Sequence, residues 1–200
     1  FNIDTIFPLV NLSKPANNSI SSTSTITFNF TATDLNLQNC ILYTNLTGSF
    51  AANDTATISG LTTGVSAGFT YNFARDGDFM WNVRCNDSAS NNAVNSTNLT
   101  LRIDTTAPAI NWMNSTGYKK GYDNFNWSTT NSITFYVNAT DINAVNCDVY
   151  TNATGSWTKN TTINYATDAM SSSSVQIFGD GSYSWNITCN DSAGNKVNGN

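Results

Sequence analysis

Alternation of apolar and polar residues dominates the chain and predicts β-strands along most of its length. Residues 26–32 alternate Ile, Phe, Phe and Ala with Thr and Asn, and residues 79–85 alternate Phe, Trp, Val and Cys with Met, Asn and Arg. The same period of two recurs at residues 99–103, 133–139 and 183–189. Successive side chains then point to opposite faces, so each predicted strand has one buried and one solvated face. No segment has a convincing helical period, and the abundant Thr, Ser and Asn are poor helix formers.

The chain contains two copies of one unit. Residues 25–50 align with residues 131–157, and residues 76–91 align with residues 180–195, with matching Cys, Trp, Asp-Gly and Asn-Asp positions. A repeat of about 100 residues predicts two domains. Several short strands with turn signals between them predict that each domain is an antiparallel β-sandwich, so the fold class is all-β.

The two ends of the chain predict how units are joined. Residues 1–8 (FNIDTIFP) align with residues 101–108 (LRIDTTAP), which carry the closing strand of the first copy. The second copy stops at KVNGN, where the first copy continues into that strand. We therefore expect residues 1–5 to complete a neighbouring unit, residues 6–104 to form the first sandwich, and residues 105–200 to form a second sandwich that lacks its last strand.

Two modes of continuation are open. Either the 200 residues are one period of a longer tandem polypeptide, or separate subunits polymerise by donor-strand complementation. In the second mode, Phe1, Asn2, Ile3, Asp4 and Thr5 of one subunit fill the open edge of the next. A head-to-tail contact of this kind does not close on itself and therefore makes a fibre. In both modes the expected partner is another copy of the unit.

Each copy has one pair of cysteines, Cys40 with Cys85 and Cys147 with Cys189. The chain has no C-x-x-C motif and no histidine, which disfavours a zinc site. One disulfide within each domain is the favoured interpretation, and it implies an oxidising, extracytoplasmic environment.

Composition excludes several classes of function. The chain has no histidine or glutamate, 13 aspartates and 8 Lys and Arg, and its net charge is −5. Scarce basic residues argue against nucleic acid or an anionic membrane as a partner, and no apolar run is long enough to span a membrane. Because no histidine can activate a Ser or Cys nucleophile, we expect no catalytic residue and no enzymatic activity.

Asparagine is unusually abundant, with 32 residues, and 15 of them begin an Asn-x-Ser/Thr sequon. Either the chain is densely N-glycosylated, or an Asn- and Thr-rich surface produces sequons by drift. Asn29, Asn98, Asn138 and Asn186 fall on predicted solvated faces, which favours glycans that would also supply solubility. The candidate sites are Asn11, Asn17, Asn29, Asn45, Asn53, Asn86, Asn95, Asn98, Asn114, Asn126, Asn138, Asn152, Asn160, Asn186 and Asn190.

Three motifs carry a family resemblance: I-D-T-T-A-P at residues 103–108, A-T-D at 32–34 and 139–141, and W-N-x-x-C-N-D-S-A-G-N at 185–195. Together they resemble the tandem immunoglobulin-like modules of prokaryotic, and in particular archaeal, cell-surface and extracellular filament proteins. The resemblance implies immunoglobulin-like sandwiches and a pilus-like filament, stalk or adhesin component at the cell surface. We therefore expect a structural subunit of an N-glycosylated, extracellular, head-to-tail filament or surface stalk.

The second copy has an insertion between Pro108 and Ile133 that holds the densest aromatic cluster of the chain. Three interpretations are open: a hairpin that packs on its own domain, a contact with a neighbouring subunit, because aromatic residues are favoured at interface cores, or a surface for sugars. The last makes an adhesin the alternative function. The candidate contact residues are Tyr118, Tyr122, Phe125 and Trp127.

Oxygen-bearing side chains converge, in the predicted topology, where a linker enters each copy. The set in copy two is Asp104, Asp141, Asn143, Asp191 and Asn195, and the equivalent set in copy one is Asp4, Asp34, Asn36, Asp87 and Asn91. Such oxygens suit Ca²⁺, which binds about six to eight of them, and Asx side chains also cap turns at strand ends. Turn capping and a Ca²⁺ ion that stiffens each interdomain joint are both open, and no other cofactor besides N-linked glycans is expected.

Overall fold

The computed structural model describes residues 2–116, 128–143, 145–164, 169–177 and 179–199. The chain divides into two compact units, unit 1 (Phe1–Thr105) and unit 2 (Thr106–Asn200). This division lies one residue from the boundary expected from the repeat.

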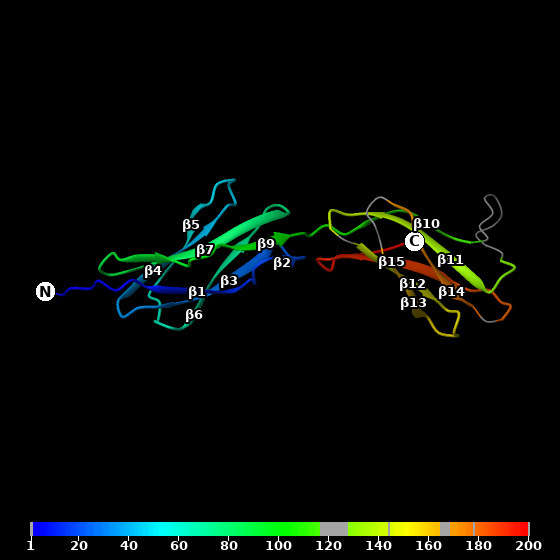
Figure 1. Ribbon diagram of the computed structural model, residues 1–200, viewed down its shortest axis with the longest axis horizontal. Coiled ribbons are helices and arrows are strands. Elements are labelled where there is room, and N and C mark those ends of the chain that lie inside the picture. Colours follow the sequence, from blue (N-terminus) through cyan, green and yellow to red (C-terminus); the bar gives the residue numbers. More distant parts are fainter. Residues whose placement is uncertain (1, 117–127, 144, 165–168, 178, 200) are drawn as a thin grey trace. The chain divides into compact units, whose positions relative to one another are not determined.

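Unit 1 is a sandwich of two β-sheets (Figure 1). One sheet has the order β1-β3-β6, and the other has the order β2-β9-β7-β4-β5, with β8 also paired to β7. All pairs are antiparallel except β2 with β9, which is parallel. The strands are β1 (Leu9–Lys14), β2 (Ser19–Ser21), β3 (Thr25–Thr33), β4 (Leu37–Thr44), β5 (Ala51–Ser59), β6 (Ser66–Asn72), β7 (Gly77–Asp87), β8 (Asn92–Val94) and β9 (Leu99–Ile103).

Unit 2 repeats most of this arrangement. Its sheets have the orders β10-β11-β14 and β13-β12-β15-β16, and all of their strand pairs are antiparallel. The strands are β10 (Ala109–Ser115), β11 (Ser132–Thr140), β12 (Val145–Thr151), β13 (Thr158–Asn164), β14 (Ser171–Gln176), β15 (Trp185–Asp191) and β16 (Lys196–Asn198). The described residues form no helix, so the predicted all-β fold of two immunoglobulin-like sandwiches is confirmed.

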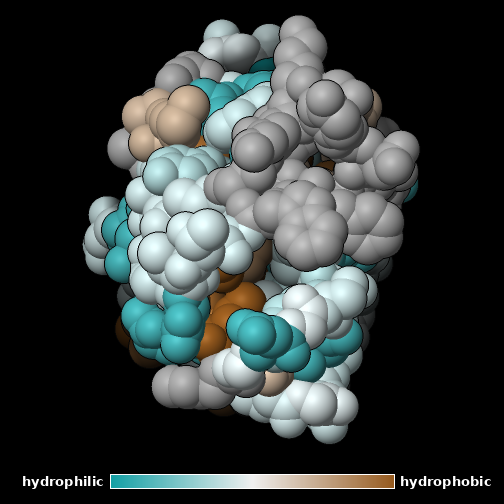
Figure 2. All heavy atoms as spheres, turned by 90° about the vertical axis from the view of Figure 1, so that its right-hand side faces the viewer, coloured by the Kyte–Doolittle hydropathy of each residue, from teal (hydrophilic) through white to brown (hydrophobic). Residues whose placement is uncertain are grey.

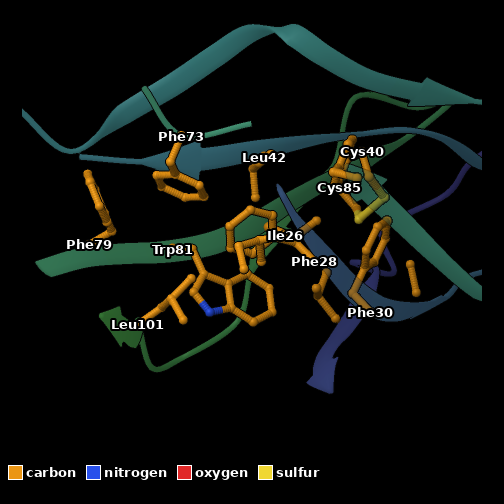
Figure 3. Close-up of a cluster of buried hydrophobic side chains, with 14 of the residues drawn as sticks. Ile26, Phe28, Phe30, Cys40, Leu42, Phe73, Phe79, Trp81, Cys85 and Leu101 are labelled. Carbon is orange, nitrogen blue, oxygen red and sulfur yellow. A yellow bond between two sulfur atoms is a disulfide. The ribbon is translucent and has the colours of Figure 1, made fainter. Parts of the chain in front are cut away.

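The inward-facing residues of the alternating segments form the core of each unit. In β3, Phe28 and Phe30 are at most 1% exposed, whereas the intervening Asn29 is partly exposed. Phe28 packs against Trp81 of β7 with ring centroids 5.0 Å apart (Figure 3). In unit 2 the corresponding pair, Phe135 and Trp185, lies 5.2 Å apart. The period of two therefore located the buried faces correctly.

A disulfide joins two central strands of one sheet in each unit. Cys40 lies directly opposite Cys85 in the β4–β7 pair, and Cys147 lies directly opposite Cys189 in the β12–β15 pair. No cysteine is free. The predicted pairing is confirmed, and all four cysteines lie within strands.

Candidate functional site

Strand β9 closes unit 1 by pairing with the first half of β7. The register places Leu99 opposite Trp81 and Ile103 opposite Gly77. Leu101 and Ile103 are only 2% and 1% exposed, and Leu101 lies beside the Trp81 indole (Figure 3). The closing strand therefore covers one end of the apolar core.

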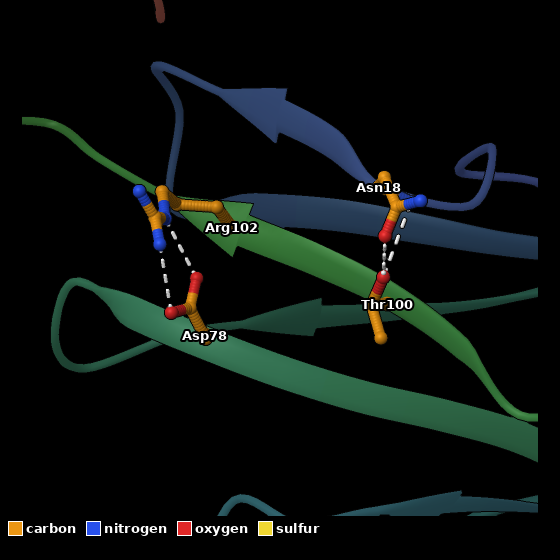
Figure 4. Close-up of polar contacts among 4 residues, drawn as sticks. All are labelled: Asn18, Asp78, Thr100 and Arg102. Atoms are coloured by element: carbon orange, nitrogen blue, oxygen red, sulfur yellow. Dashed lines mark hydrogen bonds and ion pairs between the residues drawn. The ribbon is translucent and has the colours of Figure 1, made fainter. Parts of the chain in front are cut away.

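Polar side chains hold β9 on both of its edges. Arg102 Nε and Nη2 donate to Asp78 Oδ1 and Oδ2 of β7 at 2.6 and 2.9 Å, and Thr100 Oγ1 donates to Asn18 Oδ1 at 2.6 Å (Figure 4). The hydrogen bond from Arg102 lowers the pKa of Asp78, and the same bond raises the pKa of Arg102. On the side of Asn18, β2 adds its parallel pairing with β9. Sequence reasoning missed β2, because three residues of Ser-Ile-Ser carry no strand signal.

The same edge is open in the described part of unit 2. The counterpart of β7 is β15, but β15 begins only at Trp185, and residues 181–184 lie outside any strand. These are the residues that align with Gly77–Met80, which β9 pairs in unit 1. Among the residues that the structure describes, no strand pairs with residues 181–185 from that side. In the described part of unit 2, β15 is thus shorter than β7 where no strand pairs with it.

The core of unit 2 is correspondingly less covered at this end. Trp185 and Tyr183 are partly exposed, whereas their counterparts Trp81 and Phe79 are 1% and 3% exposed. Figure 2 shows apolar side chains at the bottom of a hollow on the end of unit 2 that faces the viewer. An additional strand along residues 181–185 would bury Trp185 as β9 buries Trp81.

The segment at the start of unit 1 carries an exposed copy of the closing-strand sequence. Residues 2–8 lie outside any strand, and Ile3 is 77% exposed, whereas the aligned Ile103 is 1% exposed. Asn36 Nδ2 donates to Asp4 Oδ2 at 2.7 Å, and Asn91 Nδ2 donates to the Asp4 carbonyl at 3.1 Å. The bond from Asn36, followed by one from the Ile6 N–H, lowers the pKa of Asp4. Unit 1 therefore holds the segment at Asp4 and presents Ile3 to its surroundings.

The acidic cluster expected in copy one is present in unit 1. Carboxylate oxygens of Asp4, Asp34 and Asp87 all lie within 4.8 Å of one another, and Asp34 and Asp87 are buried. Asp87 Oδ1 accepts from the Ala89 and Asn91 N–H groups at 2.9 and 2.8 Å, and Asp34 Oδ1 accepts from the Asn36 N–H at 2.8 Å. The predicted turn capping is confirmed by these bonds. A Ca²⁺ ion in this cluster stays a prediction.

The residues expected in the second set fall in both units. Within unit 2, Asp141 Oδ1 accepts from the Asn143 N–H at 2.7 Å, and Asp191 Oδ1 accepts from the Asn195 N–H at 2.9 Å. Asp104 belongs to unit 1, where it is buried and its N–H donates to the Ser21 carbonyl at 2.9 Å. These bonds are again turn caps and strand-end bonds, and Ca²⁺ binding by this set also stays a prediction.

The sequon asparagines are accessible in the described part of the chain. None of the fourteen sequon asparagines that lie there is buried. Asn11, Asn17 and Asn98 are exposed, and the others are partly exposed. Asn45 and Asn152 occupy equivalent turns, where each Oδ1 accepts a backbone N–H at 2.8 Å, from Met80 and Ser184 respectively. Asn126 lies outside the described residues. Glycosylation at these positions stays a prediction.

Two further expectations concern the insertion and the membrane. Tyr118, Tyr122, Phe125 and Trp127 all fall within residues 117–127, which lie outside the described part of the chain. The described residues contain no helix with the length and apolar character needed to cross a lipid bilayer.

Comparisons with known proteins agree with the fold. No protein-family model matches the chain, and no curated protein matches it. A marsupial T cell receptor structure superposes with a TM-score of 0.60 at 11% identity, covering 95% of this chain and 70% of the receptor chain. The fibronectin(III)-like modules of Clostridium thermocellum CbhA superpose with a TM-score of 0.53 at 11% identity, covering 96% of this chain and 90% of theirs. The chain is thus similar to tandem immunoglobulin- and fibronectin-like modules in its fold.

Proposed function

We propose that this protein is a structural repeat of an N-glycosylated extracellular filament or surface stalk, and that its units are joined head to tail by a shared closing strand. The strand comes from the next segment of a tandem polypeptide or from a second copy of the chain. The role is mechanical rather than catalytic. The fold alone does not carry this proposal, because immunoglobulin-like sandwiches serve many functions.

The observation that carries it is the difference between the two units. Unit 1 buries Ile103 to 1% exposure in its closing strand, while the aligned Ile3 is 77% exposed. Unit 2 has the complementary feature, since residues 181–185 have no strand partner on that side among the described residues. An exposed apolar segment and an open sheet edge both promote non-specific association unless they pair with a defined partner. Pairing of a segment like residues 2–5 with the open edge at residues 181–185 would cover both.

An extracellular location is supported by the chemistry of the chain. Both pairs of cysteines form disulfides, and disulfides persist mainly in oxidising compartments. Charged residues make up only 10% of the chain, so N-linked glycans on the accessible sequons would supply surface polarity.

The alternative function, an adhesin that binds a surface partner or glycan, depends on the insertion at residues 118–127. The two functions separate experimentally in the variants Tyr122→Ala and Trp127→Ala. Loss of ligand binding with intact assembly supports an adhesin, whereas loss of assembly supports a subunit contact.

The proposed joining is tested by the assembly of the purified chain. We expect oligomers that grow with concentration in sedimentation velocity and appear as unbranched fibres by negative-stain electron microscopy. Ile3→Asp places a charge where the strand must be buried and abolishes assembly, whereas Leu9→Asp, at a residue 61% exposed beyond the segment, leaves it unchanged. A chain that stays monomeric at all concentrations, or Ile3→Asp fibres like those of the parent, contradicts the proposal.

A further inference from the structure

Asn82, on β7 of unit 1, is a buried polar residue that ties down the segment leading into the closing strand. Its side chain is 1% exposed, and its Nδ2 donates to the Asn95 carbonyl at 2.9 Å and to Asn98 Oδ1 at 2.7 Å. A longer contact of 3.4 Å reaches the Thr97 carbonyl. Residues 95–98 connect β8 to β9, so one amide group fixes the approach of the closing strand.

Asn186 is the counterpart of Asn82 in unit 2, and its amide has the same orientation without the same acceptors. In both residues Oδ1 accepts the N–H of the following residue, at 2.8 Å for Asn82 and 2.7 Å for Asn186. Asn186 is partly exposed, and no described residue accepts a hydrogen bond from its Nδ2. The equivalent of Asn95 is Gly199, directly after β16, and a segment that continues from there would bring the equivalents of Thr97 and Asn98 to the side of the open edge.

The two asparagines differ in one further respect. Asn82 is followed by Val83 and Arg84, whereas Asn186 begins the sequon Asn186-Ile187-Thr188. Sequence reasoning alone therefore made Asn186 a glycan site on a solvated face. The burial of Asn82 indicates instead that this position becomes buried once a closing strand is in place.

We propose that Asn186 is a joint residue, and that an N-linked glycan on Asn186 and completion of unit 2 by a closing strand exclude each other. This inference rests on the proposed joining of units. In the completed unit, Asn186 Nδ2 donates to carbonyl groups of the incoming segment as Asn82 does. Modification of Asn186 before assembly therefore acts as a block on chain growth.

The exclusion follows from the chemistry of the modification. N-glycosylation forms a bond between the sugar C1 and Asn Nδ2, which loses one proton, while the lipid-linked diphosphate of the donor leaves. The product keeps one N–H but carries a sugar on the atom that must enter the joint. A position that is 1% exposed in its completed counterpart has no room for that sugar.

The first test uses the chain produced without N-glycosylation, so that only the amide is varied. Asn186→Asp removes the donor while keeping the shape, and Thr188→Val removes the sequon while keeping Asn186. We expect Asn186→Asp to weaken assembly about tenfold or more, the loss of one or two hydrogen bonds to a buried group. Thr188→Val loses only the hydrogen bond from Thr188 Oγ1 to Asn198 Oδ1 within unit 2, at 2.8 Å, and should change assembly by less than about threefold. Equal assembly of the two variants and the parent overturns the inference.

The second test adds a saccharide at a chosen position of the same chain. Asn186→Cys is labelled with a maleimide-linked disaccharide, and Asn190→Cys, four residues along the same strand, is the matched control with the same label. We expect labelled Asn186→Cys to remain monomeric and labelled Asn190→Cys to assemble. Assembly of both labelled variants overturns this inference alone, whereas a parent chain that never assembles contradicts the proposed function and the inference together.

Discussion

Truncation of one isoleucine in each copy of the I-D-T motif tests most simply how much the closing strand contributes to the free energy of unfolding. Ile103 is 1% exposed and Ile3 is 77% exposed, although both precede Asp-Thr in aligned segments. Ile103→Ala removes three buried carbons, worth about 2.4 kcal/mol in transfer free energy, and a residual cavity raises the cost to about 3–4 kcal/mol. Ile3→Ala should change the free energy of unfolding of the monomeric chain by less than about 0.5 kcal/mol.

Differential scanning calorimetry of the dilute chain measures both effects. For a domain of this size, a loss of about 3 kcal/mol in the free energy of unfolding lowers Tm by about 12–24 °C. This shift should appear in the unit 1 transition of Ile103→Ala and be absent from Ile3→Ala. At concentrations where the parent assembles, Ile3→Ala should in contrast reduce the assembled fraction. Equal, small effects of the two substitutions on the dilute chain would refute the view that β9 is a core strand and that Ile3 lies in an unburied copy of it.

Three further predictions concern the disulfides, the ion pair on β9 and the acidic cluster. Reduction of Cys40–Cys85, with a sequence separation of 45, should lower the free energy of unfolding of unit 1 by about 4 kcal/mol in the chain-entropy model; unchanged urea midpoints before and after reduction would contradict this. Asp78→Asn should cost less than about 1 kcal/mol at neutral pH, because the Asp78 side chain is 71% exposed. Pairing with Arg102 lowers the folded-state pKa of Asp78. The stabilisation by the ion pair is therefore present above the unfolded-state pKa of about 3.9 and is lost as the pH falls through the lower folded-state pKa. A stability difference between parent and Asp78→Asn that persists at about pH 2 argues against the ion pair as the source of that difference. Ca²⁺ bound by Asp4, Asp34 and Asp87 should raise Tm relative to chelator, and Asp4→Asn should remove that rise; identical melts with Ca²⁺ and with chelator dismiss the ion.

Much of the fold could be predicted because its signals are local. The alternation around Phe28 and around Trp81 identifies half-buried strands, and the aligned cysteines identify both disulfides. The acidic set of copy one was also predictable, because Asp34 directly follows β3, Asp87 ends β7, and the sandwich brings these two strand ends together. These features depend on the period of two and on the repeat, which are visible in one sequence.

Other features could not be predicted because they depend on long-range register. Strand β2 has only three residues, and its parallel pairing with β9 leaves no periodic signal. Asn82 has the same place in the alternation as the exposed Arg84, and its burial arises from the path of residues 95–98. The different environments of Asn82 and Asn186 are therefore a property of the folded units and leave no signal in the local sequence.

The central claim is that the closing strand of unit 2 is supplied by a segment like residues 1–5 in the register of β9. In unit 1, Arg102 lies opposite Asp78, and the alignment assigns Asn2 and Ser182 to these positions. The most direct measurement is therefore oxidative cross-linking of the double variant Asn2→Cys/Ser182→Cys, with Asn2→Cys/Ser184→Cys as a control two residues out of register. We predict a ladder of covalent oligomers on non-reducing gels for the first variant and essentially none for the second. Equal cross-linking of both, or a ladder only for the control, would contradict the proposed joint.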